Sequence, residues 1–386
     1  MTKLSVIIPC YNCEKTLQEA VGSCYEQGFS IDEFEIVMVD DGSTDNSRTV
    51  INELAQKYNN IKLVFHKENQ GGGATRNTAV THSSSDVIFC LDSDDILPPG
   101  NLRKMYNCFI ESKMDGVLFE ETRFFTTDTN KTETVKNSPL HSPIEFADIY
   151  HKGAGFLTQV NFMYTKVAFQ MIGGYPTNHG FDTQTFGLNF LAHSLKCIVC
   201  EGTHYLHRHH QKDHKSYYER EYEKGLLSIN TYLSLEPIIE KLNDSLINKI
   251  IHYPIFTNNY HGTGVNLQSL ISDHVQTGGE LISVSAQNMD SLKHNFVNLT
   301  KNILKESYTE ALQNLAECIR IIGEPTDILL YMQIRISMGL AEIKKRHINN
   351  KTAEYLTQHH LLTVRKYRHI PDILKPLYYL YNLLLK

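Results

Sequence analysis

Five consecutive apolar residues, Val87–Leu91, run without a polar break and end in three carboxylates, Asp92, Asp94 and Asp95. Such a run is typical of a β-strand that is buried on both faces. Carboxylates this close repel one another, and a hard divalent cation with oxygen ligands would hold them together. Since ligands bind at the carboxyl ends of strands in an open α/β sheet, the stretch predicts a metal site that meets a phosphate. A solvated acidic turn after a core strand is the alternative interpretation.

Other apolar runs along the chain have the same strand-like character. They lie at 4–9, 35–39 and 61–65, with helical spacing of apolar residues between and after them at 14–27, 50–58 and 74–81. A later run, 118–125, leads into a polar loop at 126–138. Strands that alternate with helices predict a mostly parallel sheet that is covered by helices on both faces.

Polar residues follow three of the first four predicted strands. Tyr11 and Asn12 come after the first strand, Asp40 and Asp41 after the second, and Asp92–Asp95 after the fourth. Because the carboxyl ends of parallel strands meet at one edge of a sheet, we expect these side chains to converge there. The residues after Asp41 also predict a helix start, with Ser43 or Thr44 as its N-cap.

The glycine triplet Gly71–Gly73 follows the third strand and opens a helix. It has neither the spacing of a dinucleotide-binding fingerprint nor the Gly-Lys-Ser/Thr of a P-loop. Two interpretations stay open. The triplet is either a flexible turn or a place where the backbone approaches a ligand closely, with Arg76 on the following helix reaching a phosphate.

The first 215 residues or so resemble a family 2 glycosyltransferase of the GT-A fold. The matching motifs are Val6-Ile-Ile-Pro-Cys-Tyr-Asn12, Val39-Asp-Asp-Gly-Ser-Thr-Asp45, Glu68-Asn69 with Gly71–Asn77, and Leu91-Asp-Ser-Asp-Asp95. The resemblance implies an α/β fold, with a Rossmann-like, mostly parallel sheet flanked by helices and a helical C-terminal domain after it. It also implies a nucleotide-sugar donor, most often a UDP-sugar, and a divalent manganese or magnesium ion.

The resemblance also implies roles for individual residues. The donor-binding residues would be Pro9, Tyr11, Asn12, Asp40, Asp41, Arg76, Asp92 and Arg208, with Pro9, Tyr11 and Asp40 along the base and ribose. Asp94 would bind the metal, with Asp92 and His210 as further candidate ligands. A metal held there would neutralise the leaving diphosphate, and inversion would then need a carboxylate to take a proton from the acceptor hydroxyl.

Asp182 is the candidate for that catalytic base. Family members carry two acidic residues after a Gly-Gly-Tyr segment, and this chain has Gly173-Gly-Tyr175 followed by the single acid Asp182. Asp182 occupies the first acidic position if Thr183 takes the second, or the second position if Phe181 takes the first. The acidic pair is broken in both registers, and the alternative role for Asp182 is to cap the helix that follows.

Five histidines lie between 204 and 214, and together with Arg208 they form a basic segment. Family members often have an Arg/His segment here that closes over the diphosphate. Arg208 on a phosphate is the favoured assignment, and His210 is the histidine proposed for the metal. A surface or core histidine is the alternative for each one.

The chain beyond residue 216 predicts a second domain, 217–386, which is mostly helical. Its last segment, 361–386, holds five basic residues against the single acid Asp372, and leucines and tyrosines fill much of the rest. Such an amphipathic tail suits the surface of an anionic membrane, or it docks on the protein's own core or on a second subunit.

The net charge of −6 gives no signal for nucleic-acid binding. No apolar run approaches the roughly 20 residues of a membrane span, so we expect a cytoplasmic protein, or one at the inner face of the cell membrane. The predicted function is inverting, metal-dependent transfer of a sugar to a hydroxyl of a cell-surface glycan or lipid-linked acceptor. The alternative is a non-catalytic subunit that binds the nucleotide sugar or acts as a scaffold in a glycan assembly complex.

Overall fold

The structure of the protein, a computed structural model, describes residues 2–139, 141–146, 148, 161–177, 181–209, 233, 236–242, 247, 286–323, 329, 332–333 and 336. Two compact units divide the chain. The first comprises 1–214 with 267–275, and the second comprises 215–266 with 276–386. The boundary at 216/217 that the sequence suggested falls outside the described residues and stays a prediction.

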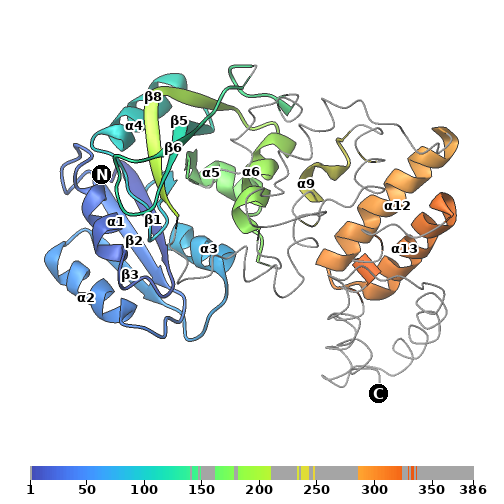
Figure 1. The fold of residues 1–386 in the computed structure, drawn as a ribbon, viewed down its shortest axis with the longest axis horizontal. Coiled ribbons are helices and arrows are strands. Elements are labelled where there is room, and N and C mark those ends of the chain that lie inside the picture. Colours follow the sequence, from blue (N-terminus) through green and yellow to red (C-terminus); the bar gives the residue numbers. More distant parts are fainter. Residues whose placement is uncertain are drawn as a thin grey trace. The chain divides into compact units, whose positions relative to one another are not determined.

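A single mixed sheet of eight strands lies at the centre of the described part of the first unit, with helices packed against it (Figure 1). The strands are β1 (Leu4–Cys10), β2 (Phe34–Asp40), β3 (Ile61–Phe65), β4 (Val87–Cys90), β5 (Gly116–Phe125), β6 (Glu133–Lys136), β7 (Met163–Thr165) and β8 (Cys197–Arg208). They are ordered β3-β2-β1-β4-β7-β5-β6, and β8 also pairs with β5.

The strand directions explain why distant residues meet at one edge of this sheet. β1 is parallel to both β2 and β4, and β2 is parallel to β3. β7 is antiparallel to both β4 and β5, so β5 runs in the same direction as β4, and β8 is parallel to β5. β1, β2, β3, β4, β5 and β8 therefore end at the same edge. Asp92 and Asp94 follow β4 there, and Arg208 ends β8.

Helices cover the sheet. They are α1 (Leu17–Cys24), α2 (Ser47–Lys57), α3 (Gly72–His82), α4 (Asn101–Ser112), α5 (Lys166–Met171) and α6 (Asp182–Ala192). Alternate residues of β1, such as Val6 and Ile8, are fully buried in a core shared with α1, α2 and α4. α3 packs against β1 and β2 as well. Because successive residues of a strand point to opposite faces, a continuous apolar run such as Val6–Ile8 serves both faces.

The structure confirms the fold class predicted from the sequence, and it confirms the first four strands. Two local predictions are wrong. α2 begins at Ser47 after Asn46, rather than with Ser43 or Thr44 as its N-cap, because both of those residues are hydrogen-bonded to Asn12. The predicted polar loop 126–138 contains the fully exposed strand β6, which pairs with β5 through its backbone and has no apolar side to reveal it.

In the second unit, α12 (Ala286–Leu304) and α13 (Tyr308–Ile322) form a helical hairpin, and α9 (Glu236–Ile239) is a single turn. A chain of side-chain amides joins the two long helices, from Asn302 to Asn314 at 3.0 Å and from Asn314 to Asn295 at 3.0 Å. The predicted tail 361–386 lies outside the described residues.

Among the helices that the structure describes, none combines the length and the apolar character needed to cross a bilayer.

Candidate active site

Arg76 lies between two carboxylates that come from distant parts of the chain. Its Nη2 donates to Asp92 Oδ1 at 2.7 Å, and its Nη1 donates to Asp182 Oδ2 at 2.8 Å. Asp92 follows β4 and Asp182 is the first residue of α6, so one guanidinium on α3 joins three segments. The three side chains are 11–19% exposed, so water screens the ion pairs weakly.

The electrostatics of this cluster bear directly on Asp182. Burial raises the pKa of its carboxyl group, the Arg76 guanidinium opposes that shift, and the neighbouring Asp92 adds to it. Arg76 itself keeps a buried Nε that has no hydrogen-bond partner among the described residues. A buried N–H without an acceptor is costly, and an oxygen of a bound ligand would relieve that cost.

Close packing within the protein explains the glycines Gly72 and Gly73: the neighbours that a side chain would meet there belong to the chain itself. A Cβ on Gly73 would lie 2.0 Å from the carbonyl oxygen of Pro176, and one on Gly72 would lie 2.7 Å from Arg76 Nη1. Gly71 has φ of +91°, which favours glycine, with open space around it. The triplet therefore lets the start of α3 press against the segment that leads into α6.

Gly73→Ala is expected to destabilise the fold by about 2 kcal/mol, because the new methyl group overlaps a backbone carbonyl that cannot rotate away. Chemical denaturation measures this free energy. Gly22→Ala on α1 is the matched control: a Cβ there meets nothing within 4 Å, so the better helix propensity of alanine should leave stability equal or raise it by up to about 1 kcal/mol. Equal effects of the two changes would contradict the packing account.

Asn77, next to Arg76, fixes the other side of this junction. Its Nδ2 donates to the carbonyl of Tyr175, and its Oδ1 accepts from the Tyr175 N–H, both at 2.8 Å. The Tyr175 ring stacks on Phe186 of α6 with centroids 3.9 Å apart. Arg76 and Asn77 thus connect α3 to Asp182 and to the Gly-Gly-Tyr segment, respectively.

Asp92 and Asp94 are hard oxygen donors of the kind that a divalent cation takes, but within the described part of the chain no group of three or more candidate ligands comes together. Both aspartates are partly buried after β4. The Asp94 carbonyl accepts from Arg208 Nε at 2.7 Å, and this bond attaches the loop that carries the two aspartates to the end of β8. Two carboxylates are a partial ligand set of the kind that magnesium and manganese complete with water and phosphate oxygens. His210, the third predicted ligand, lies outside the described residues.

Asp95, the third of the strand-end carboxylates for which the sequence suggested a cation, is instead held by donors of the protein. It is fully buried, and its carboxylate accepts from the Tyr205 hydroxyl at 2.8 Å, from the Arg208 N–H at 2.7 Å and from His207 Nδ1 at 3.0 Å. Burial raises the pKa of Asp95 to about 6. Burial disfavours the charged His207, but the Asp95 carboxylate outweighs this and raises the His207 pKa to about 9. Asp95 therefore ties the end of β8 to the Asp92–Asp94 loop.

Arg208 reaches the same edge of the sheet from the end of β8. Its side chain donates to the Asp94 carbonyl, pairs with Glu19 of α1 and lies over the Phe125 ring, 4.5 Å from the centroid. The structure thus brings Arg208 beside Asp94, 114 residues away in the sequence. A cation next to two candidate metal ligands is suited to bind an anionic group of a donor.

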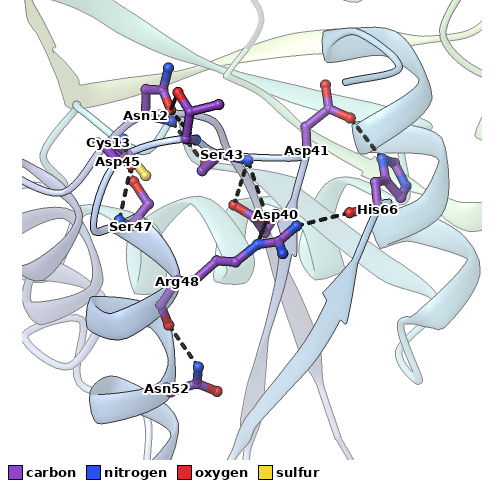
Figure 2. Close-up of polar contacts among 11 residues, drawn as sticks. Asn12, Cys13, Asp40, Asp41, Ser43, Asp45, Ser47, Arg48, Asn52 and His66 are labelled. Carbon is purple, nitrogen blue, oxygen red and sulfur yellow. Dashed lines mark hydrogen bonds and ion pairs between the residues drawn. The ribbon is translucent and has the colours of Figure 1, made fainter. Parts of the chain in front are cut away.

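The predicted nucleotide-binding residues gather at the ends of β1 and β2 (Figure 2). Asn12 has φ of +50°, and its backbone N–H and side-chain oxygen bond to Ser43 Oγ and to the Thr44 N–H. The Tyr11 ring is 47% exposed, whereas Pro9 is partly buried in β1. The turn after β2 is therefore anchored to the loop after β1, with an aromatic ring exposed beside it.

Asp40 is fully buried at the end of β2 and is ion-paired with Arg48 Nε at 2.7 Å. Arg48 also donates to the carbonyl of His66 at 3.0 Å (Figure 2). Its guanidinium lies over Phe65, 5.7 Å from the ring centroid. Asp41, the neighbouring acid, points the other way and is bonded to His66 at 2.7 Å. Sequence reasoning did not identify Arg48 or His66, which carry no motif of their own.

Residues 5–173 match the family model described as glycosyl transferase family 2. An uncharacterized glycosyltransferase of Haemophilus influenzae is 36% identical over 114 residues, which are 30% of this chain and 45% of that protein. A poly(ribitol-phosphate) beta-glucosyltransferase of Bacillus spizizenii is 36% identical over 117 residues, 30% of this chain and 18% of that protein. The chain therefore spans less than half the length of these curated relatives.

The fold is similar to a crystal structure of S. aureus TarS 1–349 in complex with UDP-GlcNAc. The TM-score is 0.52, the sequence identity 17%, and the match covers 84% of this chain and 93% of that one. At this identity the likeness concerns the fold alone.

Proposed function

Residues 5–173 form a family 2 glycosyltransferase domain, and from that premise we propose that the chain moves a sugar from a nucleotide diphosphate donor to an acceptor hydroxyl with inversion. The donor is a UDP-sugar. The acceptor is a cell-surface glycan or a lipid-linked precursor of one.

The observation that carries this proposal is the bridge from Arg76 to Asp92 and Asp182. It brings a carboxylate that can accept a proton next to the strand end where the donor would bind. The cluster is weakly hydrated and holds the proton acceptor Asp182, the Arg76 guanidinium and the strand-end acid Asp92. Such a set of groups is suited to the transfer of a sugar from one oxygen to another.

The nucleotide half of the proposed site is supported by the ends of β1 and β2. The exposed Tyr11 side chain can stack on a base, and the fully buried Asp40 carboxylate supports the same edge by binding Arg48 and the Ser43 N–H. TarS, whose fold this chain resembles, has been crystallised with UDP-GlcNAc and with UDP. These points favour a uracil nucleotide.

Asp94 and Asp92 would hold a manganese or magnesium ion, which when bound supplies positive charge to the leaving diphosphate. Arg208, beside Asp94, adds a second positive charge from the end of β8. Arg76 holds Asp92 in place from the other side. This arrangement follows the rule that preorganised charges stabilise the charge that develops during a reaction.

In the proposed reaction, the carboxylate of Asp182 accepts the proton of the acceptor hydroxyl as its oxygen attacks the anomeric carbon. The bond to the diphosphate breaks on the opposite face, so that the configuration inverts. Arg76 opposes the rise that burial causes in the pKa of Asp182 and fixes the position of its carboxylate. The surroundings of Asp182 are largely dry, which strengthens these interactions.

The relatives' names support a polyhydroxylated acceptor, since one is a poly(ribitol-phosphate) glucosyltransferase. The predicted place of action, the inner face of the cell membrane, is supported by the basic residues of 361–386. Residues 1–216 belong to the proposed transferase domain, and 217–386 to the proposed accessory domain.

A nucleotide screen tests the donor. UDP is expected to raise the melting temperature in the presence of manganese more than GDP, CDP or dTDP does. A ligand present at about one hundred times its dissociation constant stabilises the folded state by roughly 2.7 kcal/mol. Equal stabilisation by all four nucleotides, or by none, would contradict the proposal.

The same screen, followed by a turnover assay, separates this proposal from its rival. A non-catalytic subunit would bind UDP and neither hydrolyse nor transfer the sugar of any UDP-sugar. The single acid at Asp182 motivates that rival, and slow donor hydrolysis by the protein would exclude it.

A further inference from the structure

Both carboxylate oxygens of Asp41 are engaged inside the protein. Oδ1 accepts from the Gln70 N–H at 2.9 Å and bonds to His66 Nδ1 at 2.7 Å, and Oδ2 accepts from the Gly71 N–H at 2.9 Å. The Asp41 side chain is only 4% exposed. Its bonding capacity is thus directed to the turn that precedes α3.

The backbone next to Asp41 is fitted to the same turn. A Cβ on Gly42 would lie 2.8 Å from both the Asn69 nitrogen and the Glu68 carbonyl carbon. Two successive residues after β2 therefore hold the 68–71 turn, one by packing and one by hydrogen bonds.

His66 extends this attachment from the turn to the helix. Its Nδ1 bonds to Asp41, and its Nε2 bonds to the Thr78 hydroxyl on α3 at 3.0 Å. Its backbone is fixed as well: the N–H donates to the Asp40 carbonyl at 2.8 Å, and the carbonyl accepts from Arg48 (Figure 2). The imidazole therefore connects the ends of β2 and β3 with the second turn of α3.

The position of α3 decides where Arg76 lies. Thr78 is two residues beyond Arg76, so the two side chains leave the helix in different directions. His66 secures one side of α3, while Arg76 leaves another side toward Asp92 and Asp182. The Gly72–Gly73 contacts leave no spare room between α3 and the segment before α6.

We infer that Asp41 and His66 are positioning residues of the transferase: they lock the 68–71 turn and α3, and so hold Arg76 where it can orient Asp182. This inference rests on the proposed function. Asp41 then acts through Arg76 and not by contact with the donor, a different role from the one implied by the family resemblance.

The test compares Thr78→Val and His66→Asn with wild type. Valine keeps the shape of threonine without its hydroxyl, and asparagine keeps a donor near the position of Nδ1 but loses Nε2. The control is Thr81→Val, an exposed residue of α3 whose hydroxyl donates to the Asn77 carbonyl within the same helix. Three quantities are measured for each protein: the rate of amide hydrogen exchange in 68–76, the affinity for UDP, and the rate at which UDP is released from a UDP-sugar that the wild type turns over.

We expect exchange in 68–76 to quicken about tenfold in both variants and to stay at the wild-type rate in the control. Turnover should fall about tenfold with UDP affinity within twofold of wild type. In an Arg76→Lys background, Thr78→Val should lower turnover less than twofold further, since the residue it acts through is already altered.

Unchanged exchange would overturn the inference, as would equal losses of UDP affinity and turnover, or a full additional loss in the Arg76→Lys background. A wild-type protein that neither binds UDP nor cleaves a UDP-sugar would refute the proposed function instead. The exchange measurement would still decide whether the bond from His66 to Thr78 holds the turn and α3.

Discussion

Asp94→Asn is expected to lower sugar transfer by about a thousandfold, equivalent to roughly 4 kcal/mol of transition-state stabilisation. The neutral amide is a poor ligand for a divalent cation, whereas the side-chain shape is unchanged. Asp94 lies after β4, beside Arg208 and next to the buried Asp95 that anchors the loop. The loop should therefore keep its conformation, and the loss should come from the missing charge.

Two measurements distinguish this from general damage. The extra thermal stabilisation by UDP that manganese brings should disappear in Asp94→Asn, while its melting temperature without ligand stays close to that of wild type. Asp32→Asn, an exposed aspartate, is the matched control and should behave like wild type in both assays. Undiminished transfer by Asp94→Asn would refute a metal-dependent site at the end of β4.

Asp182→Asn is expected to reduce turnover by about a thousandfold, within the range of 10²–10⁴ for loss of a general base. The amide oxygen can still accept the 2.8 Å hydrogen bond from Arg76, so the cluster should survive. Donor affinity should remain within a few-fold of wild type, because Asp182 acts on the acceptor. Steady-state kinetics and UDP calorimetry report the two quantities separately.

The pH dependence gives Asp182 a second signature. Only the ionised carboxylate accepts a proton, so turnover should rise with pH and then level off. Because burial raises the pKa of Asp182, the rise should extend above the pH range in which an exposed aspartate ionises. Loss of the rise of turnover with pH in Asp182→Asn would agree with the assignment. Wild-type turnover in this variant would mean that the base lies elsewhere.

The strand core could be predicted because its signal is local. The run Val87–Leu91 and its three predecessors are long, apolar and bounded by polar residues, and all became strands of one sheet. β6 has no such signal, since all four of its residues are exposed, and it is held to β5 by backbone pairing and by the ion pair of Lys136 with Glu120. The start of α2 was misplaced because contacts with Asn12, more than thirty residues earlier, recruit Ser43 and Thr44.

The location of the candidate site could be predicted more readily than the contacts between its side chains. Strand order brings the residues after β1, β2 and β4 to one edge, which a pattern of alternating strands and helices implies. The partners of Arg76 could not be foreseen. It was expected to reach a phosphate, yet in the structure it contacts carboxylates 16 and 106 residues away.

His66 was missed for a related reason, since it lies in no position that a pattern marks. Asp95 was marked as one of the strand-end carboxylates, but its bonds to β8 were not foreseen. Each acquires its role from partners brought near it by the fold. Asp95 gathers three donors from β8, and His66 joins Asp41 to Thr78. Such roles depend on tertiary distances that no local spacing contains.

The exposed Tyr11 ring at the end of β1 also gives the protein an optical property. The chain has 21 tyrosines and no tryptophan, so its ultraviolet emission comes from phenol rings alone. Tyr11→Trp would introduce the chain's sole indole at the end of β1, where the nucleotide is proposed to bind. A base stacking on that indole would quench its fluorescence, so donor occupancy could be followed in real time without any attached dye.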